Sequence, residues 1–173
     1  SVTSGANNGS SWDDAFIDLQ SALSMAVGGS QIWVAEGTYY PTSGTDRTAS
    51  FALAGGVSLY GGFAGGETTR GERDWVTNVT TLSGDIGVVA DNSDNSYHVV
   101  SCIAPDEFTP LVASIDGFVV TGANSVGQPD TARGGGIRVE YGTLIGRNLQ
   151  LVDNQAQYGG GLANQFGEVH LEN

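Results

Sequence analysis

Gly134-Gly135-Gly136-Ile137 is repeated 25 residues later as Gly159-Gly160-Gly161-Leu162. The repeat extends past the glycines, because Tyr141-Gly142 returns as Phe166-Gly167 at the same spacing. A fixed period of this length is typical of proteins in which each repeat forms one coil lying on the next. One coil cannot bury its apolar side chains by itself, so the pattern predicts a stack of coils around a continuous core.

Short apolar stretches separated by glycine fill the chain from residue 31 onward. No helical periodicity lies between them, which excludes doubly wound and barrel α/β folds. With about three short strands per repeat, we predict an all-β fold, a right-handed parallel β-helix. The strands are expected at residues 31–35, 37–40, 50–53, 57–60, 80–82, 98–102, 115–120, 136–139, 142–145, 148–152 and 168–171.

One helix is expected before the strands. Trp12, Phe16, Leu19 and Leu23 follow the spacing of one helix face, Ser11 precedes them as an N-cap, and Gly28-Gly29 ends the run. A stack of coils needs a cover on its first coil, because open strand edges invite pairing with other chains. We therefore predict a single domain, with residues 1–29 as an N-terminal capping helix and residues 30–173 as coils.

The repeat spacing changes upstream. Gly117 corresponds to Asn148, a spacing of 31 rather than 25 residues. We therefore expect an insertion of about six residues, forming a protruding loop, within residues 125–133.

The composition limits the partners. Nineteen acidic residues stand against six arginines, lysine is absent, and the net charge is −13. Nucleic-acid surfaces need clustered Lys and Arg, so we expect no nucleic-acid partner, and no apolar stretch is long enough for membrane insertion. The acidity suits a secreted, very soluble protein or a cation binder. Cys102 has no partner for an internal disulfide and is expected to be a small buried hydrophobe.

The C-terminal third resembles the repeats of chlamydial polymorphic outer-membrane proteins. Those repeats pair a Gly-Gly-apolar element with a Phe-x-x-Asn element. The first is matched by Gly135-Gly136-Ile137 and Gly160-Gly161-Leu162, and the second by Leu151-Val152-Asp153-Asn154, where leucine replaces phenylalanine.

The N-terminal two-thirds resembles secreted bacterial right-handed β-helix proteins of the pectate-lyase-like superfamily. The resemblance is carried by stretches at residues 32–39, 59–63, 82–86 and 95–100. It implies a fold rather than one activity, since that superfamily contains lyases, hydrolases, esterases, adhesins and structural proteins.

A catalytic set is hard to find in the sequence. Polysaccharide hydrolases need paired carboxylates, and lyases need acids that hold Ca²⁺ together with a base. Asp116, Arg147 and Glu172 align at the repeat spacing, but this predicts an exposed ladder of alternating charge. His98 and His170 are expected to be ordinary strand or surface residues. Enzymatic activity therefore stays uncertain, with the residues favouring none.

Two constellations are candidate binding sites. Asp91-Asn92-Ser93-Asp94-Asn95, with Asp85 nearby, gathers oxygen ligands in one loop, so Asp85, Asp91 and Asp94 are candidate calcium ligands. Turns in which Asp and Asn bind their own backbone are the alternative. Tyr141 and Phe166 should stack between adjacent coils, either as core packing or as a platform for sugars.

Together these features predict a non-catalytic extracellular surface, adhesive or structural module belonging to a larger protein or assembly. The expected partners are another coil or subunit stacked at the C-terminal end, formed by residues 159–173, and extracellular polysaccharide. The alternative is a polysaccharide-acting enzyme, a lyase or a hydrolase, or a carbohydrate-binding module.

Overall fold

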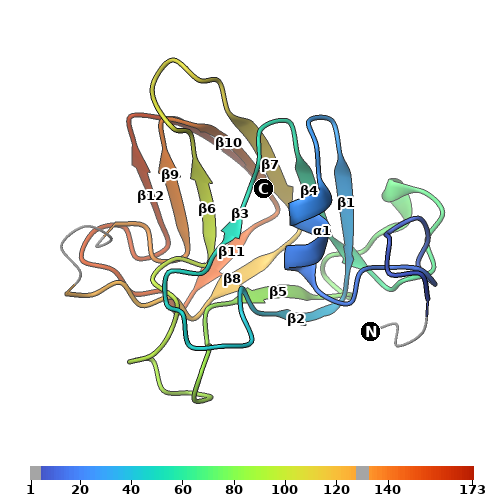
Figure 1. The fold of residues 1–173 in the computed structure, drawn as a ribbon, viewed down its shortest axis with the longest axis horizontal. Coiled ribbons are helices and arrows are strands. Elements are labelled where there is room, and N and C mark those ends of the chain that lie inside the picture. The colour runs from blue at the N-terminus through green and yellow to red at the C-terminus, as the bar shows by residue number, and fades with distance from the viewer. Residues whose placement is uncertain (1–4, 128–132) are drawn as a thin grey trace.

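The computed structural model describes residues 5–127 and 133–173 and is drawn in Figure 1. The described part contains one α-helix, one 3-10 turn and a series of short strands. Their bounds are α1 Leu19–Met25, β1 Gln31–Ala35, β2 Gly37–Tyr39, β3 Phe51–Ala52, β4 Ser58–Phe63, η1 Arg70–Glu72, β5 Thr80–Ser83, β6 Val100–Ile103, β7 Val112–Asp116, β8 Val119–Thr121, β9 Ile137–Glu140, β10 Thr143–Arg147, β11 Gln150–Val152, β12 Leu162–Gln165 and β13 Glu168–Glu172.

The strands form three sheets in which every pairing is parallel. Sheet A has the order β1-β4-β7-β10-β13, sheet B the order β2-β5-β8-β11, and sheet C the order β3-β6-β9-β12. Each strand thus pairs with the strand three places later in the chain. The chain visits sheets A, B and C in turn, and we call one such passage a round. The all-β, parallel part of the predicted fold is confirmed.

The pairing register matches the sequence repeat. Ile137 pairs with Leu162 in sheet C, and Leu144 with Val169 in sheet A, both 25 residues apart. One round earlier, Val119 pairs with Gln150 at a spacing of 31. The bridge Asn124–Gln155 keeps the longer spacing and the bridge Arg133–Tyr158 has the shorter one. The expected six-residue insertion therefore lies between Asn124 and Arg133, although residues 128–132 and the predicted protrusion are outside the described part.

The core lies between the three sheets. Alternate residues of each strand point inward, as expected for strands with one buried face. Sheet A contributes Leu59, Ile115 and Leu144, sheet B contributes Leu82 and Val120, and sheet C contributes Phe51, Val100, Cys102, Ile137 and Val139, all fully buried. Cys102 is the buried hydrophobe that was expected, and burial raises the pKa of its thiol to about 11.

The predicted helix is much shorter than the sequence pattern suggested. Only Leu19–Met25 is helical, and its N-cap is Asp18, whose side chain accepts the N–H of Ser21 at 2.7 Å, rather than Ser11. The helix packs against β1 and β3 through buried Leu19 and Leu23. Within the described part, no helix is long and apolar enough to cross a membrane.

The reason for the shorter helix lies in the polar residues of the preceding segment, residues 5–18, which we call the N-terminal arm. Asp14 accepts the N–H of Ala6 on its carboxylate, and its carbonyl accepts the N–H groups of Asn8 and Gly9. Asn7 accepts the N–H of Ile17. These short polar side chains satisfy backbone groups in turns, which competes with helix formation.

Most predicted strands are present within two or three residues of their expected ends. Two differences have a physical cause. The expected strand 115–120 is divided into β7 and β8 at Gly117, where φ is 82° and a side chain would collide with Arg73 and the Gly61 carbonyl. Strand β12 was not expected, although it is the repeat counterpart of β9.

Several long connections leave the rounds, and an arginine fastens each of the two that we call excursions. Residues 64–79 connect β4 with β5, and Arg73 of this excursion pairs with Asp116 at 2.6 Å while its guanidinium lies 4.9 Å from the Trp75 ring centroid. Residues 40–50 connect β2 with β3, and Arg47 donates to the carbonyls of Asn95 and Asn124.

The predicted charge ladder is correct only at one end. Asp116, Arg147 and Glu172 do share one register line of sheet A, and the exposed Arg147–Glu172 pair is 2.8 Å long. Asp116, however, is buried, because the excursion carrying Arg73 covers it. The expectation of a wholly exposed ladder was wrong, since no repeat pattern could place Arg73.

The first prediction concerns the helix. Leu23→Ala should lower the free energy of unfolding by about 2–3 kcal/mol, because it removes a buried side chain from the cover of the first round. Met25→Ala is the matched control in the same helix: Met25 is 71% exposed, and its loss should cost under about 0.5 kcal/mol. Urea unfolding measures both, and equal effects would contradict a capping role for α1.

The second prediction concerns Arg73. Arg73→Lys should cost about 2 kcal/mol or more, because one ammonium group cannot reproduce the forked contacts of the guanidinium to the carboxylate and carbonyl of Asp116 and to the Gly61 carbonyl. Arg147→Lys alters an exposed pair on the same register line and should change stability by less than about 0.5 kcal/mol. Thermal and urea unfolding of the two variants decide this; similar losses would show that the Arg73 pair is not special.

Candidate functional site

The acidic loop lies between β5 and β6. Each predicted calcium ligand in it accepts a hydrogen bond from a backbone N–H group of the same loop. Asp85 accepts the N–H of Ala90 at 3.0 Å, Asp91 that of Ser93 at 2.9 Å, and Asp94 that of Val88 at 2.8 Å. The Ser93 side chain and its N–H hold the pKa of Asp91 below its ordinary value. Each carboxylate therefore closes a turn.

The structure does not gather these acids around one point. Within residues 5–127 and 133–173, no group of three or more His, Cys, Asp or Glu side chains is placed to hold a metal ion. The arrangement agrees with the turn interpretation. Calcium binding by Asp85, Asp91 and Asp94 stays a prediction, and it would require these carboxylates to exchange N–H donors for the ion.

Sequence reasoning missed a buried polar corner beside this loop. Asp94 Oδ1, Asn95 Oδ1, Ser96 Oγ and Ser125 Oγ are buried and have no hydrogen-bond partner in the described part of the chain. Their segments are held together, since the Asn95 amide donates to the Gly122 carbonyl at 2.6 Å and Asn124 N–H donates to the Ser96 carbonyl at 2.9 Å. Asn and Ser are common in turns, so composition gave no signal for their burial.

The two histidines occupy ordinary positions. His98 is buried, and its Nδ1 lies 2.7 Å from the Gly134 carbonyl, which can only accept, so Nδ1 carries the proton. Burial lowers the pKa of His98, the Gly134 contact opposes the shift, and the charge of Arg138 lowers it further. His170 is exposed beside Glu168 on sheet A. No nucleophile is hydrogen-bonded to either ring among the described residues.

The aromatic residues of the repeat stack as predicted. The Tyr141 and Phe166 ring centroids are 5.2 Å apart and the rings are tilted by 18°. They lie at the corners after β9 and β12, where Tyr141 is half-buried and Phe166 is 71% exposed. Core packing was therefore the wrong expectation for their location. Stacking covers the ring faces that the two residues turn toward each other, while Phe166 keeps most of its surface exposed.

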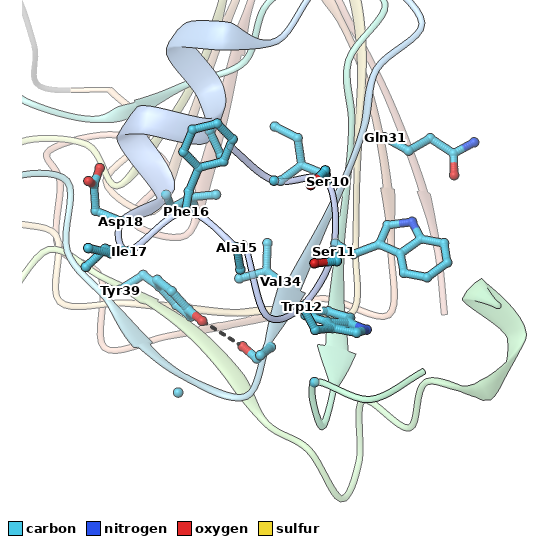
Figure 2. Close-up of a pocket in the computed structure, with 18 of the residues that line it drawn as sticks. Ser10, Ser11, Trp12, Ala15, Phe16, Ile17, Asp18, Gln31, Val34 and Tyr39 are labelled. Carbon is cyan, nitrogen blue, oxygen red and sulfur yellow. Dashed lines mark hydrogen bonds between the residues drawn. The ribbon is translucent and has the colours of Figure 1, made fainter. Parts of the chain in front are cut away.

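A hollow lies between the N-terminal arm and the first round (Figure 2). We call it the N-terminal cleft; its volume is about 1240 Å³ and residues 30–39, which include all of β1 and β2, line one side. The arm forms the opposite side with Trp12, Ala15 and Phe16.

Aromatic side chains hold the two sides of the cleft at a fixed distance. Trp12 of the arm packs 5.5 Å from Phe63 and 6.4 Å from Trp33, measured between ring centroids, and Trp33 stacks on Phe63 at 4.8 Å. The Trp12 indole N–H donates to the Glu67 carbonyl at 2.9 Å. The arm is therefore anchored at Trp12 and again at α1, with the cleft between these two points.

The charged side chains that line the cleft are all acidic. Asp18 and Glu36 are exposed and Glu67 is half-buried, and no arginine lines the cleft in the described part. The Tyr39 hydroxyl inside the cleft donates to the Ala35 carbonyl at 3.1 Å, and burial raises the pKa of Tyr39 (Figure 2). The cleft thus combines an apolar, aromatic interior with a negatively charged rim.

The apolar pattern gives no sign of this cleft, because Trp12, Phe16, Leu19 and Leu23 have the spacing of one helix face lying on the first coil. The only signal was the density of turn-forming residues before the helix, at Asn7, Asn8, Gly9, Asp13 and Asp14. Comparison of the chain with protein families, with curated proteins and with solved structures gave no match.

The calcium prediction can be tested on the acidic loop. If Asp85, Asp91 and Asp94 bind calcium, excess calcium should raise the melting temperature by mass action relative to a chelator, and Asp94→Asn should abolish that rise. If the acids only close turns, the two melting curves of the wild type coincide. Calorimetry distinguishes these outcomes, with Asp106→Asn as the control, since Asp106 closes a similar turn in another loop through its contacts with Phe108 and Thr109.

Proposed function

We propose that the chain is a stretch of right-handed parallel β-helix and acts as a non-catalytic module of an extracellular or cell-surface protein, with an adhesive or structural role. The observation that carries this proposal is the order of the sheets: each strand pairs, in parallel, with the strand three places later through all rounds. A stack of this kind extends by adding further rounds and presents long, regular sides.

The exposed side of the last strands supports an assembly role. Strands β11, β12 and β13 each lie at an edge of their sheet. Core positions that are fully buried in earlier rounds become accessible here: Leu144 is buried and its partner Val169 is half-buried, while Leu171 is exposed. Apolar groups beside open strand edges favour pairing with another strand layer, so we propose that a second copy of the chain stacks on this side.

The charge supports an extracellular setting. A net charge of −13 keeps a protein soluble and discourages contact with nucleic acids and anionic membranes. The resemblance to secreted β-helix proteins of the pectate-lyase-like superfamily and to chlamydial polymorphic outer-membrane proteins points the same way, and extracellular polysaccharide is a second partner class under this proposal.

The alternative is a polysaccharide-acting enzyme, either a lyase or a hydrolase, or a carbohydrate-binding module. The observation that favours it is the aromatic lining of the N-terminal cleft, since Trp and Tyr rings pack well against sugars. Against an enzyme, the charged side chains that line the cleft in the described part are Asp18, Glu36 and Glu67, and no histidine stands among the lining residues to serve as a general base.

The stacking prediction uses two exposed phenylalanines. Phe166→Glu should abolish concentration-dependent self-association, because it places a charge in the corner stack next to the open strand edges. Phe108→Glu is the matched control: Phe108 is 84% exposed in the loop between β6 and β7, compared with 71% for Phe166. Light scattering over a concentration series measures both. A chain that stays monomeric, or loses association equally in both variants, would contradict the proposal.

The absence of catalysis is tested separately. We expect no unsaturated products and no new reducing ends from pectin, pectate or a panel of neutral and acidic glycans. Turnover that disappears when Asp18 or Glu36 is replaced by its amide would establish the alternative function instead.

A further inference from the structure

We infer that the N-terminal cleft is a docking site for an extended peptide of a partner protein, which adds to the free edge of β1 and carries basic side chains among apolar ones. This inference goes beyond the proposed function and does not depend on it, because the cleft and the stacking side use different strands.

The backbone of β1 has one side that no neighbouring strand pairs in the described part of the chain. Ser58 N–H donates to the Ser30 carbonyl at 2.9 Å and Glu36 N–H donates to the Phe63 carbonyl at 2.7 Å, so even-numbered residues face β4. In a parallel pair, alternate residues direct their N–H and C=O groups toward the same neighbour. Gln31 and Trp33 therefore direct theirs to the opposite side, away from β4.

The arm does not use these groups. In the described part, no backbone hydrogen bond joins residues 5–18 to β1 or β2, since the arm's own bonds close turns onto Trp12 and Asp14. Further along β1, the Tyr39 hydroxyl already satisfies the Ala35 carbonyl. The open stretch thus runs over Gln31–Trp33 and ends at Ala35. An edge strand left open inside a cleft is the geometry in which extended peptides bind by strand addition.

The volume of the cleft also favours a peptide. The cleft of about 1240 Å³ exceeds the roughly 300–1,000 Å³ of a typical small-molecule pocket. Its lining includes apolar groups on the arm, among them Trp12 and Ala15 (Figure 2), and Ala22 on α1. A space of this volume beside a strand edge fits several peptide residues better than one compact ligand.

The charge of the cleft favours a basic peptide. Asp18, Glu36 and Glu67 are the charged side chains of the cleft, and no arginine lines it among the described residues. A peptide whose polar positions are Arg or Lys meets complementary charge at the rim, whereas an acidic peptide meets repulsion. This complementarity selects a basic, apolar peptide over an acidic one and over an acidic polysaccharide.

The test uses a synthetic heptapeptide, acetyl-Val-Arg-Val-Arg-Val-Arg-Val-amide, titrated into the intact chain by calorimetry. Binding should weaken by about tenfold or more when alternate peptide nitrogens are methylated on the pairing edge, because the strand hydrogen bonds are lost. The counterpart with glutamate in place of arginine should not bind measurably. Hydrogen exchange at Gln31 and Trp33 should slow when the arginine peptide is bound.

Two protein variants locate the site. Ala15→Trp fills the cleft and should weaken peptide binding about tenfold or more. Ala54→Trp places the same side chain at an exposed position that does not line the cleft and should leave binding unchanged. Circular dichroism checks that both variants are folded, and Phe166→Glu should bind the peptide normally, which separates this inference from the stacking proposal.

Several outcomes would overturn the inference. One is the absence of binding by the arginine peptide at about 1 mM, a concentration at which even weak complexes form. The others are binding of the methylated peptide as tight as that of the unmethylated peptide, and binding by Ala15→Trp as tight as by the wild type. Binding of a neutral hexasaccharide that Ala15→Trp removes, with no binding of the peptide, would assign the cleft to carbohydrate instead.

Discussion

The whole structure depends on the parallel register between each strand and the strand three places later. Because side chains alternate along a strand, a slip of one residue would move every apolar group of a round from the core to the surface. The register stays constant over long stretches: five successive residues of β10 pair with β7 on one side and with β13 on the other. Core residues such as Leu59, Ile115 and Leu82 can meet between the sheets only while this register holds.

The same register restricts where extra chain can be placed. Because an insertion inside a strand shifts the pairing, most added residues lie between strands, as in the excursions at residues 40–50 and 64–79 and the insertion after Asn124. The exception is an irregularity between β1 and β4, where Trp33 pairs with Tyr60 but Ala35 pairs with Phe63. Each excursion must then be fixed by contacts outside the ladder. Arg47 and Arg73 do this by donating to carbonyls of other rounds, those of Asn95 and Asp116, while lying on aromatic rings. Arginine suits this work because its planar group donates in several directions and stacks at the same time.

The regular strands and the irregular connections differ in how far the sequence could predict them. The repeated glycines and the alternating strands are local patterns with a fixed period, so the parallel all-β arrangement, most strands and the six-residue insertion followed from them. The burial of Asp116 could not be predicted in this way, because its partner Arg73 belongs to an excursion that lies outside the sequence repeat. The helix predicted over the N-terminal arm was wrong for a different reason. Trp12 and Phe16 have helical spacing, but Asn7 and Asp14 satisfy backbone groups in turns. An apolar pattern does not record this competition.

Regularity also determines where binding can arise in such a chain. Along the three parallel sheets, neighbouring positions repeat in columns, and a column of similar residues rarely assembles the mixed groups that recognise a ligand. Distinct groups meet only where irregular chain folds back on the rounds. The N-terminal arm is the clearest case in the described part, because it brings Trp12 to Trp33 and Phe63 while leaving the edge of β1 unpaired. The irregular segment that the sequence pattern described least well is therefore the one that creates the most specific surface.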